Sequence, residues 1–135
     1  MNYYLAIDIG ASSGRHILGH MEKGRLITEE VHRFDNAQVS RNGHDCWDID
    51  RLWTGILDGL KACKAVDKIP ITLGIDTWAV DYVLLDANDQ ILGDAVAYRD
   101  SRTRGMDAVL ESMVSQEELY ARTGIQKQAF NTVYQ

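Results

Sequence analysis

Three segments that favour β-structure follow one another at the start of the chain, and they restrict the fold more than any other feature. Residues 3–9, 15–21 and 25–34 are rich in β-branched, aromatic or other apolar residues, a composition typical of strands. Only short turns separate them: the small residues at 10–14, and Lys23-Gly24. Tight turns between consecutive strands predict an antiparallel meander.

A long amphipathic helix is predicted next. Asp48 can cap its N-terminus, and Pro70 prevents it from continuing. Residues 71–75 then form another apolar strand that ends at Asp76. A helix between the meander and this strand predicts a mixed sheet with the helix on one face. Apolar residues at helical spacing mark the face that packs on the sheet: Ile49, Leu52, Trp53, Ile56, Leu57, Leu60 and Cys63.

The remaining segments are predicted as shorter elements. Residues 35–46 are polar and form a loop, and residues 80–85 and 91–98 form a hairpin. A helix follows over 103–114. Ser115 and Glu118 match a capping box, so a last helix begins there and ends at Gly124.

Composition restricts the compartment and the partners. A chain of 135 residues with a net charge of −6 is one domain without the basic face that nucleic-acid binding needs. It contains no apolar run long enough to span a membrane and no signal peptide at its start, so we expect a cytoplasmic protein with no membrane partner. The spacing of Cys46 and Cys63 matches no metal motif, and both are expected to be reduced thiols.

The turn after the first strand is a candidate anion site. Its small residues let backbone N–H groups approach an anion closely, and its serines add hydroxyl donors. It is neither a Walker A loop nor a Rossmann fingerprint, because it leads into a strand and lacks both motifs. An ordinary hairpin turn is the alternative. The residues predicted to bind phosphate are Gly10, Ala11, Ser12, Ser13, Gly14 and Arg15.

Two aspartates near strand ends are candidate metal ligands. Asp8 interrupts an apolar strand, which costs free energy unless the carboxylate is paired or bound to a metal. Asp76 ends the strand at 71–75. If the two strands are neighbours, both carboxylates lie at one edge of the sheet, where Mg²⁺ could link them to a phosphate. A role of Asp76 as a cap or turn residue is the alternative.

A third candidate is the segment DTWAVDY at 76–82. An aromatic ring can stack on the C–H groups of a polyol while a carboxylate accepts its hydroxyl hydrogens. A turn in which Trp78 fills the core is the alternative. Residues 98–102, YRDSR, either reach the same pocket or form a helix start that is rich in ion pairs.

Four motifs together resemble the start of the FGGY carbohydrate kinases, and within that family the rhamnulokinase group. They are DIGASSGR at 8–15, GIDTWAVD at 74–81, AYRDSRT at 97–103 and TGIQ at 123–126. The resemblance runs over nearly the whole chain. It implies an α/β domain of the ribonuclease-H-like (actin/hexokinase) type, with ATP and a sugar held between two such domains, and transfer of a phosphoryl group from ATP to the 1-hydroxyl of L-rhamnulose.

The same resemblance implies roles for individual residues. The turn from Ala11 to Arg15 would contact the ATP phosphates, and Asp8 would hold the Mg²⁺ region. The residues that would line the sugar pocket are Trp78, Ala79, Asp81, Tyr98, Phe130 and Asn131. Ala79 departs from the pattern, which usually has glycine there, so one extra methyl group would face the sugar.

The length also departs from the family pattern. Residues 1–135 correspond to an incomplete first domain. The general base and the nucleotide-binding second domain would lie beyond residue 135, so no catalytic residue is assigned and the isolated chain is expected to be inactive.

Other functions stay open at this point. The chain could belong to another FGGY kinase, acting on fuculose or xylulose, or to a metal-dependent nuclease that uses Asp8 and Asp76 on the same fold. It could also be a silent fragment that self-associates through exposed strand edges.

Overall fold

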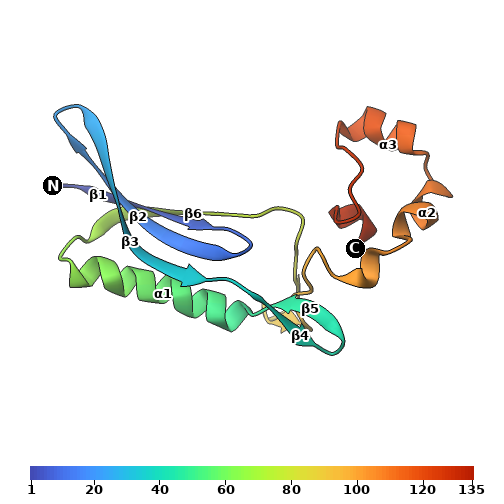
Figure 1. Cartoon of the computed structure of the whole chain (residues 1–135), viewed down its shortest axis with the longest axis horizontal. Helices are drawn as coiled ribbons and strands as arrows, with labels where there is room; N and C mark the ends of the chain where they lie inside the picture. The colour runs from blue at the N-terminus through green and yellow to red at the C-terminus, as the bar shows by residue number, and fades with distance from the viewer. The chain divides into compact units, whose positions relative to one another are not determined.

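The computed structural model describes all residues from Met1 to Gln135. The chain divides into two compact units, drawn in Figure 1. The first unit comprises Met1–Ala37 and Asp48–Ala79, and the second comprises Gln38–Trp47 and Val80–Gln135.

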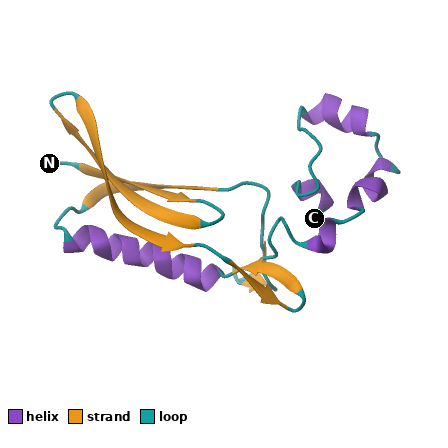
Figure 2. Ribbon diagram, viewed as in Figure 1, coloured by secondary structure: helices purple, strands orange, loops and turns teal.

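A four-stranded mixed sheet forms the body of the first unit, in the order β3-β2-β1-β6 (Figure 2). Strands β1 (Tyr3–Ile9), β2 (Ser13–Glu22) and β3 (Arg25–Asp35) pair antiparallel, as predicted. Strand β6 (Pro70–Thr77) pairs parallel with β1, which confirms the mixed sheet and places the two candidate metal strands side by side.

Helix α1 (Ile49–Ala65) lies along the sheet against β2 and β3 (Figure 1). Its predicted cap is confirmed: the Asp48 carboxylate accepts a hydrogen bond from the Arg51 N–H at 3.1 Å. No helix in residues 1–135 is long and apolar enough to cross a membrane.

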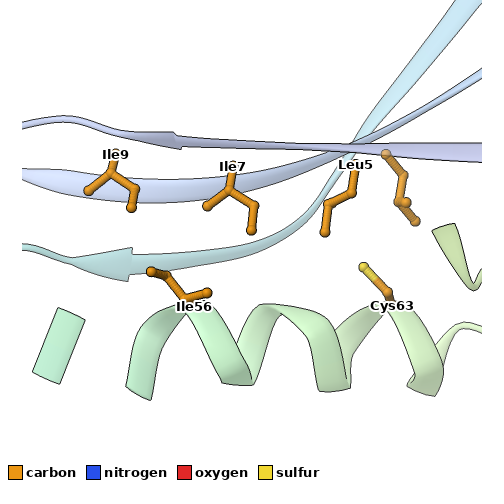
Figure 3. Close-up of a cluster of buried hydrophobic side chains, with 6 residues drawn as sticks. Leu5, Ile7, Ile9, Ile56 and Cys63 are labelled. Atoms are coloured by element: carbon orange, nitrogen blue, oxygen red, sulfur yellow. The ribbon is translucent and has the colours of Figure 1, made fainter. Parts of the chain in front are cut away.

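The core of the first unit lies between α1 and the sheet. Leu5, Ile7 and Ile9 alternate along β1 and point toward the helix, where Ile56 and Cys63 meet them (Figure 3). Because side chains alternate across a strand, Asp8 points to the opposite face of the sheet. The alternation therefore resolves how an apolar strand can carry a carboxylate.

His16 is a fully buried polar residue of this layer. It lies under α1, with Nε2 3.1 Å from the carbonyl oxygen of Ile56. A Cβ atom at Gly59 would come within 2.2 Å of the His16 ring, so glycine lets the helix approach β2 this closely. Burial lowers the pKa of His16, and the neighbouring His32 lowers it further, although the hydrogen bond to Ile56 opposes them.

The second unit begins with a hairpin that the sequence did not predict. Strands β4 (Gln38–Arg41) and β5 (His44–Trp47) pair antiparallel within the region expected to be a loop. Asn42 and Gly43 form the turn, and both have positive φ angles, +51° and +83°. This dipeptide is a strong hairpin signal, but each strand is only four residues long.

The hairpin predicted over 80–85 and 91–98 is much shorter than expected. Only β7 (Leu84–Leu85) and β8 (Ile91–Leu92) pair, and Val96 forms an isolated bridge to Cys46. The prediction of a strand from residue 80 is wrong because Val80 has a φ of +74°, outside the β region.

The C-terminal part of the second unit contains short helices. The helix predicted over 103–114 is broken: η1 (Ser101–Thr103) is followed by Gly105, with a φ of +78°, and then by α2 (Met106–Glu111). Helix α3 (Gln116–Thr123) begins as predicted, since Ser115 accepts a hydrogen bond from the Glu118 N–H, and it ends at Gly124. The short helix η2 (Thr132–Tyr134) follows.

Candidate functional site

The candidate phosphate turn joins β1 to β2 and is tied to the end of β3. The Gly10 N–H donates to the Ser13 carbonyl at 2.9 Å, inside the turn. Asn36 holds the turn from outside: its side-chain amide donates to the Gly10 carbonyl at 2.9 Å and its backbone N–H donates to the Ser12 carbonyl at 3.0 Å. Three carbonyl oxygens, which would repel an anion, are thus occupied. Sequence reasoning missed Asn36, because a single asparagine after a strand matches no motif.

Four charged residues form one row across the sheet, on the face opposite α1. Arg33 on β3 pairs with Arg15 on β2, Arg15 pairs with Asp8 on β1, and Asp8 pairs with Asp76 on β6. Residues paired in this way have side chains on the same face and within about 5.5 Å at Cβ. We call these four residues the charged row. The predicted proximity of Asp8 and Asp76 is confirmed.

Opposite charges stabilise the charged row. Arg15 Nε lies 3.2 Å from Asp8 Oδ2, so Asp8 has a partner within the protein. The Arg33 guanidinium binds Glu30 at 2.6 Å, and this hydrogen bond lowers the pKa of Glu30. The side chains of Arg15 and Asp8 are 39% and 45% exposed, respectively. The row is therefore accessible from solvent, with two guanidinium groups at one end and two carboxylates at the other.

The two carboxylates suit a magnesium ion that keeps several waters, and they are too few for a metal site built from protein ligands alone. No group of three or more His, Cys, Asp or Glu residues that could hold a metal occurs in the chain. Mg²⁺ prefers oxygen ligands and usually retains several waters, with one or two carboxylates and substrate phosphates completing its shell. Asp8 and Asp76 match that donor set.

Three of the predicted sugar residues lie together in the second unit. The Trp47 indole Nε1–H donates to Asp81 Oδ2 at 2.6 Å, and the Trp47 ring lies 6.4 Å from that of Tyr98. Tyr98 in turn meets Phe130 edge to face at 5.6 Å. Sequence reasoning missed Trp47, which directly follows the segment 35–46 predicted to be a loop and matches no motif.

The other predicted sugar residues lie in different surroundings. Asn131 follows Phe130, and its side chain donates to the Gln126 carbonyl at 2.9 Å. Trp78 and Ala79 belong to the first unit, where Trp78 is partly buried against the core and Ala79 is exposed. The packing of Trp78 agrees with the core alternative for this residue.

Asp100 has a structural role in the segment YRDSR. It is 4% exposed and accepts hydrogen bonds from the backbone N–H groups of Asp45 and Arg102, both at 2.9 Å. His44 Nδ1 lies 3.1 Å from Asp100 Oδ1, the oxygen that also accepts from the Arg102 N–H. Burial opposes ionisation, but these hydrogen bonds outweigh it and lower the pKa of Asp100. The segment is thereby fastened to β5.

The chain belongs to the FGGY family of carbohydrate kinases, whose N-terminal domain matches residues 3–135. Both the fold and the charged row fall within this matched region. The match confirms the resemblance seen in the four sequence motifs, and with it the prediction that the chain belongs to a family of sugar kinases.

Within this family, the chain is similar to several proteins named rhamnulokinase. The chain is 58% identical over 131 residues to the rhamnulokinase of Oceanobacillus iheyensis, covering 97% of this chain and 28% of that protein. It is 54% identical over 136 residues to the rhamnulokinase of Halalkalibacterium halodurans, covering 100% and 29%. The chain thus spans less than a third of the length of these relatives.

A solved structure confirms the fold class. The ligand-bound xylulose kinase from Lactobacillus acidophilus superposes with a TM-score of 0.79 over 99% of this chain and 27% of that one, at 12% identity. At such low identity the likeness concerns the fold alone. It agrees with the α/β domain with a mixed sheet that the sequence predicted.

Proposed function

We propose that this chain is the N-terminal part of an ATP-dependent kinase that phosphorylates the 1-hydroxyl of L-rhamnulose in the cytoplasm. The observation that carries the proposal is the similarity, over nearly the whole chain, to relatives named rhamnulokinase. The charged row adds a physical reason, because phosphoryl transfer depends on positioning and on neutralising charge.

The phosphates of ATP would bind at the guanidinium end of the charged row. The turn from Gly10 to Gly14 offers small residues that a phosphate can approach closely. Arg15 follows the turn directly, and Arg33 lies beside it on β3. Two guanidinium groups in line would compensate the negative charge that develops on the transferred group.

The carboxylate end would hold the metal ion. Asp8 and Asp76 would bind Mg²⁺, which when bound shields the charge of the phosphate oxygens. Arg15 pairs with Asp8, and a cation on Asp8 would compete for this carboxylate and so favour a contact of Arg15 with a phosphate.

The sugar would bind to aromatic surfaces and polar groups together. Within the second unit, Tyr98 and Phe130 offer ring faces for the C–H groups of the ketose, and Asn131 adds a polar group. Asp81 would support these residues through the turn on which it lies. We assign the general base to a part of the kinase outside residues 1–135, so the isolated chain binds its ligands weakly and does not turn over.

A nuclease is the second candidate, and the adjacent carboxylates of Asp8 and Asp76 favour it. A two-metal nuclease needs further acidic ligands and a basic surface for its substrate. The chain has no cluster of three metal ligands, and its net charge is −6. The kinase therefore agrees better with both observations.

Nuclear magnetic resonance titration of the isotope-labelled chain tests the proposal. We expect L-rhamnulose to shift resonances of Tyr98 and Phe130 at lower concentrations than L-fuculose or D-xylulose. MgATP should shift those of residues 8–15, and Arg15→Gln should weaken this effect by about tenfold, as expected for one charged hydrogen-bonding partner. Arg25→Gln, at the far end of β3, is the matched control.

Three results would each overturn one part of the proposal. One is equal or tighter binding of D-xylulose or L-fuculose, which would change the substrate. Another is cleavage of DNA or RNA with Mg²⁺ or Mn²⁺, which would favour the nuclease. The third is phosphorylation of L-rhamnulose by the isolated chain above background, which would overturn the assignment of the base to another part.

A further inference from the structure

Trp47 is a buried side chain with a polar contact that no part of the proposed reaction uses. It ends β5, is 2% exposed, and donates its indole N–H to Asp81 Oδ2 at 2.6 Å. A short hydrogen bond to a carboxylate is stronger than one between neutral groups. It joins two residues that are 34 positions apart in the sequence.

The carboxylate of Asp81 is directed into the protein. Besides the oxygen that binds Trp47, the second oxygen, Oδ1, is buried. Because its carboxylate is bound to Trp47, Asp81 also restricts the position of its own backbone. Asp81 thus serves the proposed sugar site chiefly by fixing the turn on which it lies.

The neighbouring residue shows why this turn has to be held. Val80 has a φ of +74°, which is strained for a β-branched residue and persists only when the surroundings impose it. Its carbonyl oxygen accepts hydrogen bonds from Thr132 Oγ1 at 2.7 Å and from Gln135 Nε2 at 3.0 Å. The Val80 carbonyl is therefore held by Thr132 and Gln135, and the Asp81 carboxylate is held by Trp47 of β5.

We propose that Trp47 is a positioning residue that holds the strained Val80–Asp81 turn through its hydrogen bond to Asp81. The Trp47 ring also packs beside Tyr98, which contacts Phe130. One side chain thus connects the turn with two of the rings assigned to the sugar. Its importance for sugar binding rests on the proposed function, whereas its hold on the turn does not.

Hydrogen exchange of the indole N–H groups tests the contact directly. In the wild-type chain the Trp47 indole N–H should exchange with solvent far more slowly than that of Trp53, which is 57% exposed on α1. Asp81→Ala should accelerate exchange at Trp47 by about tenfold or more, the loss expected for one hydrogen bond to a charged group. Asp81→Asn keeps an oxygen acceptor, so most of the protection should remain.

Trp47→Phe tests the effect on the turn, because it keeps an aromatic ring beside Tyr98 and removes the N–H donor. We expect shifted backbone resonances at residues 80–82 and faster amide exchange there, with Trp53→Phe as the matched control. The double variant Trp47→Phe/Asp81→Ala should change the turn no more than either single variant. Unchanged resonances at 80–82 in Trp47→Phe, or effects that simply add in the double variant, would overturn the proposal.

A ketose titration of the same variants separates this proposal from the function. Weaker L-rhamnulose binding by Trp47→Phe than by Trp53→Phe supports a positioning role within the sugar site. If the wild-type chain binds no ketose but the turn still responds to Trp47→Phe, the proposed function fails and the positioning role stands. If ketose binds equally to both variants while the turn changes, the role of Trp47 in the sugar site is overturned.

Discussion

The two units of this chain reach an ordered structure by different means. The first unit relies on long strands, one long helix and a continuous apolar layer that includes Leu5, Ile7 and Ile56. The second has strands of two to four residues, and individual polar side chains hold it together. Asp100, Asp81 and Gln135 each connect segments that are more than 30 residues apart.

This difference indicates which part of the candidate site tolerates single substitutions. The charged row is positioned by the backbone register of the sheet, so no single side chain determines where its members lie. The aromatic and polar residues of the second unit depend on specific hydrogen bonds, each of which one substitution can remove. We therefore expect the two units to respond to different classes of mutation.

The largest effect should come from removing a buried side chain of the first unit. Ile7 is 1% exposed, and Ile7→Ala should lower the free energy of unfolding by about 3 kcal/mol, because it removes apolar burial and leaves a cavity. Urea unfolding followed by hydrogen exchange of each unit measures it. Tyr4→Ala, on the other face of β1 and 46% exposed, should cost much less. Equal costs would show that the apolar layer is not what stabilises this unit.

A smaller effect should follow from removing the polar anchor of the second unit. Asp100→Ala should cost about 2 kcal/mol, because two backbone N–H groups and His44 lose their acceptor. Hydrogen exchange should rise at β5 and η1 and remain unchanged in α1. Glu117→Ala, on the exposed first turn of α3, serves as the control. An equal rise in the exchange rate of α1 would mean that the two units unfold together and are not stabilised independently.

The smallest expected effect is a difference in how the stability of each unit depends on pH. Burial lowers the pKa of His16, so the folded first unit binds this proton less readily than the unfolded chain does. Its stability should therefore decrease as the pH falls below about 6.5, the ordinary pKa of histidine. The pKa of Asp100 is also lowered, but here the ionised form is the one that the folded unit favours. Its contribution to the second unit should persist until the pH falls below about 3.9, the ordinary value for aspartate.

Urea midpoints at pH 7.5 and 5.5 would measure this contrast, with hydrogen exchange to separate the units. His16→Phe, which replaces the imidazole with an uncharged ring, should flatten the pH dependence of the first unit. If the second unit lost more stability than the first between pH 7.5 and 5.5, the assignment of the pH effect to His16 would be contradicted.

The sequence predicted the first unit well because its signals are periodic. Alternation in β1 and the helical stripe of α1 each repeat over several residues, so no single position decides the assignment. Asp8 and Asp76 could also be placed together in advance, since adjacent parallel strands bring their C-terminal ends to the same edge.

The second unit was harder to predict because distant residues determine its local structure. Val80 looks like a strand residue, but hydrogen bonds from Thr132 and Gln135 hold its carbonyl in a turn. The β4–β5 hairpin is not predicted although its Asn42-Gly43 dipeptide favours a turn, because four-residue strands carry too short a pattern. Arg33 and Trp47 match no motif, and only the register of β3 and the contact with Asp81 place them near the predicted residues.

The register of the sheet also determines which changes of sequence the charged row can tolerate. Arg15, Asp8 and Asp76 share one face because their strands pair in step. Replacing one of these residues removes one charge and leaves the other positions intact. A single-residue insertion or deletion within β1 would instead turn every later side chain of that strand to the other face. Asp8 would then enter the apolar layer under α1, and Ile7 or Ile9 would reach the surface. Variation in length within β1 should thus be far more damaging than variation in composition.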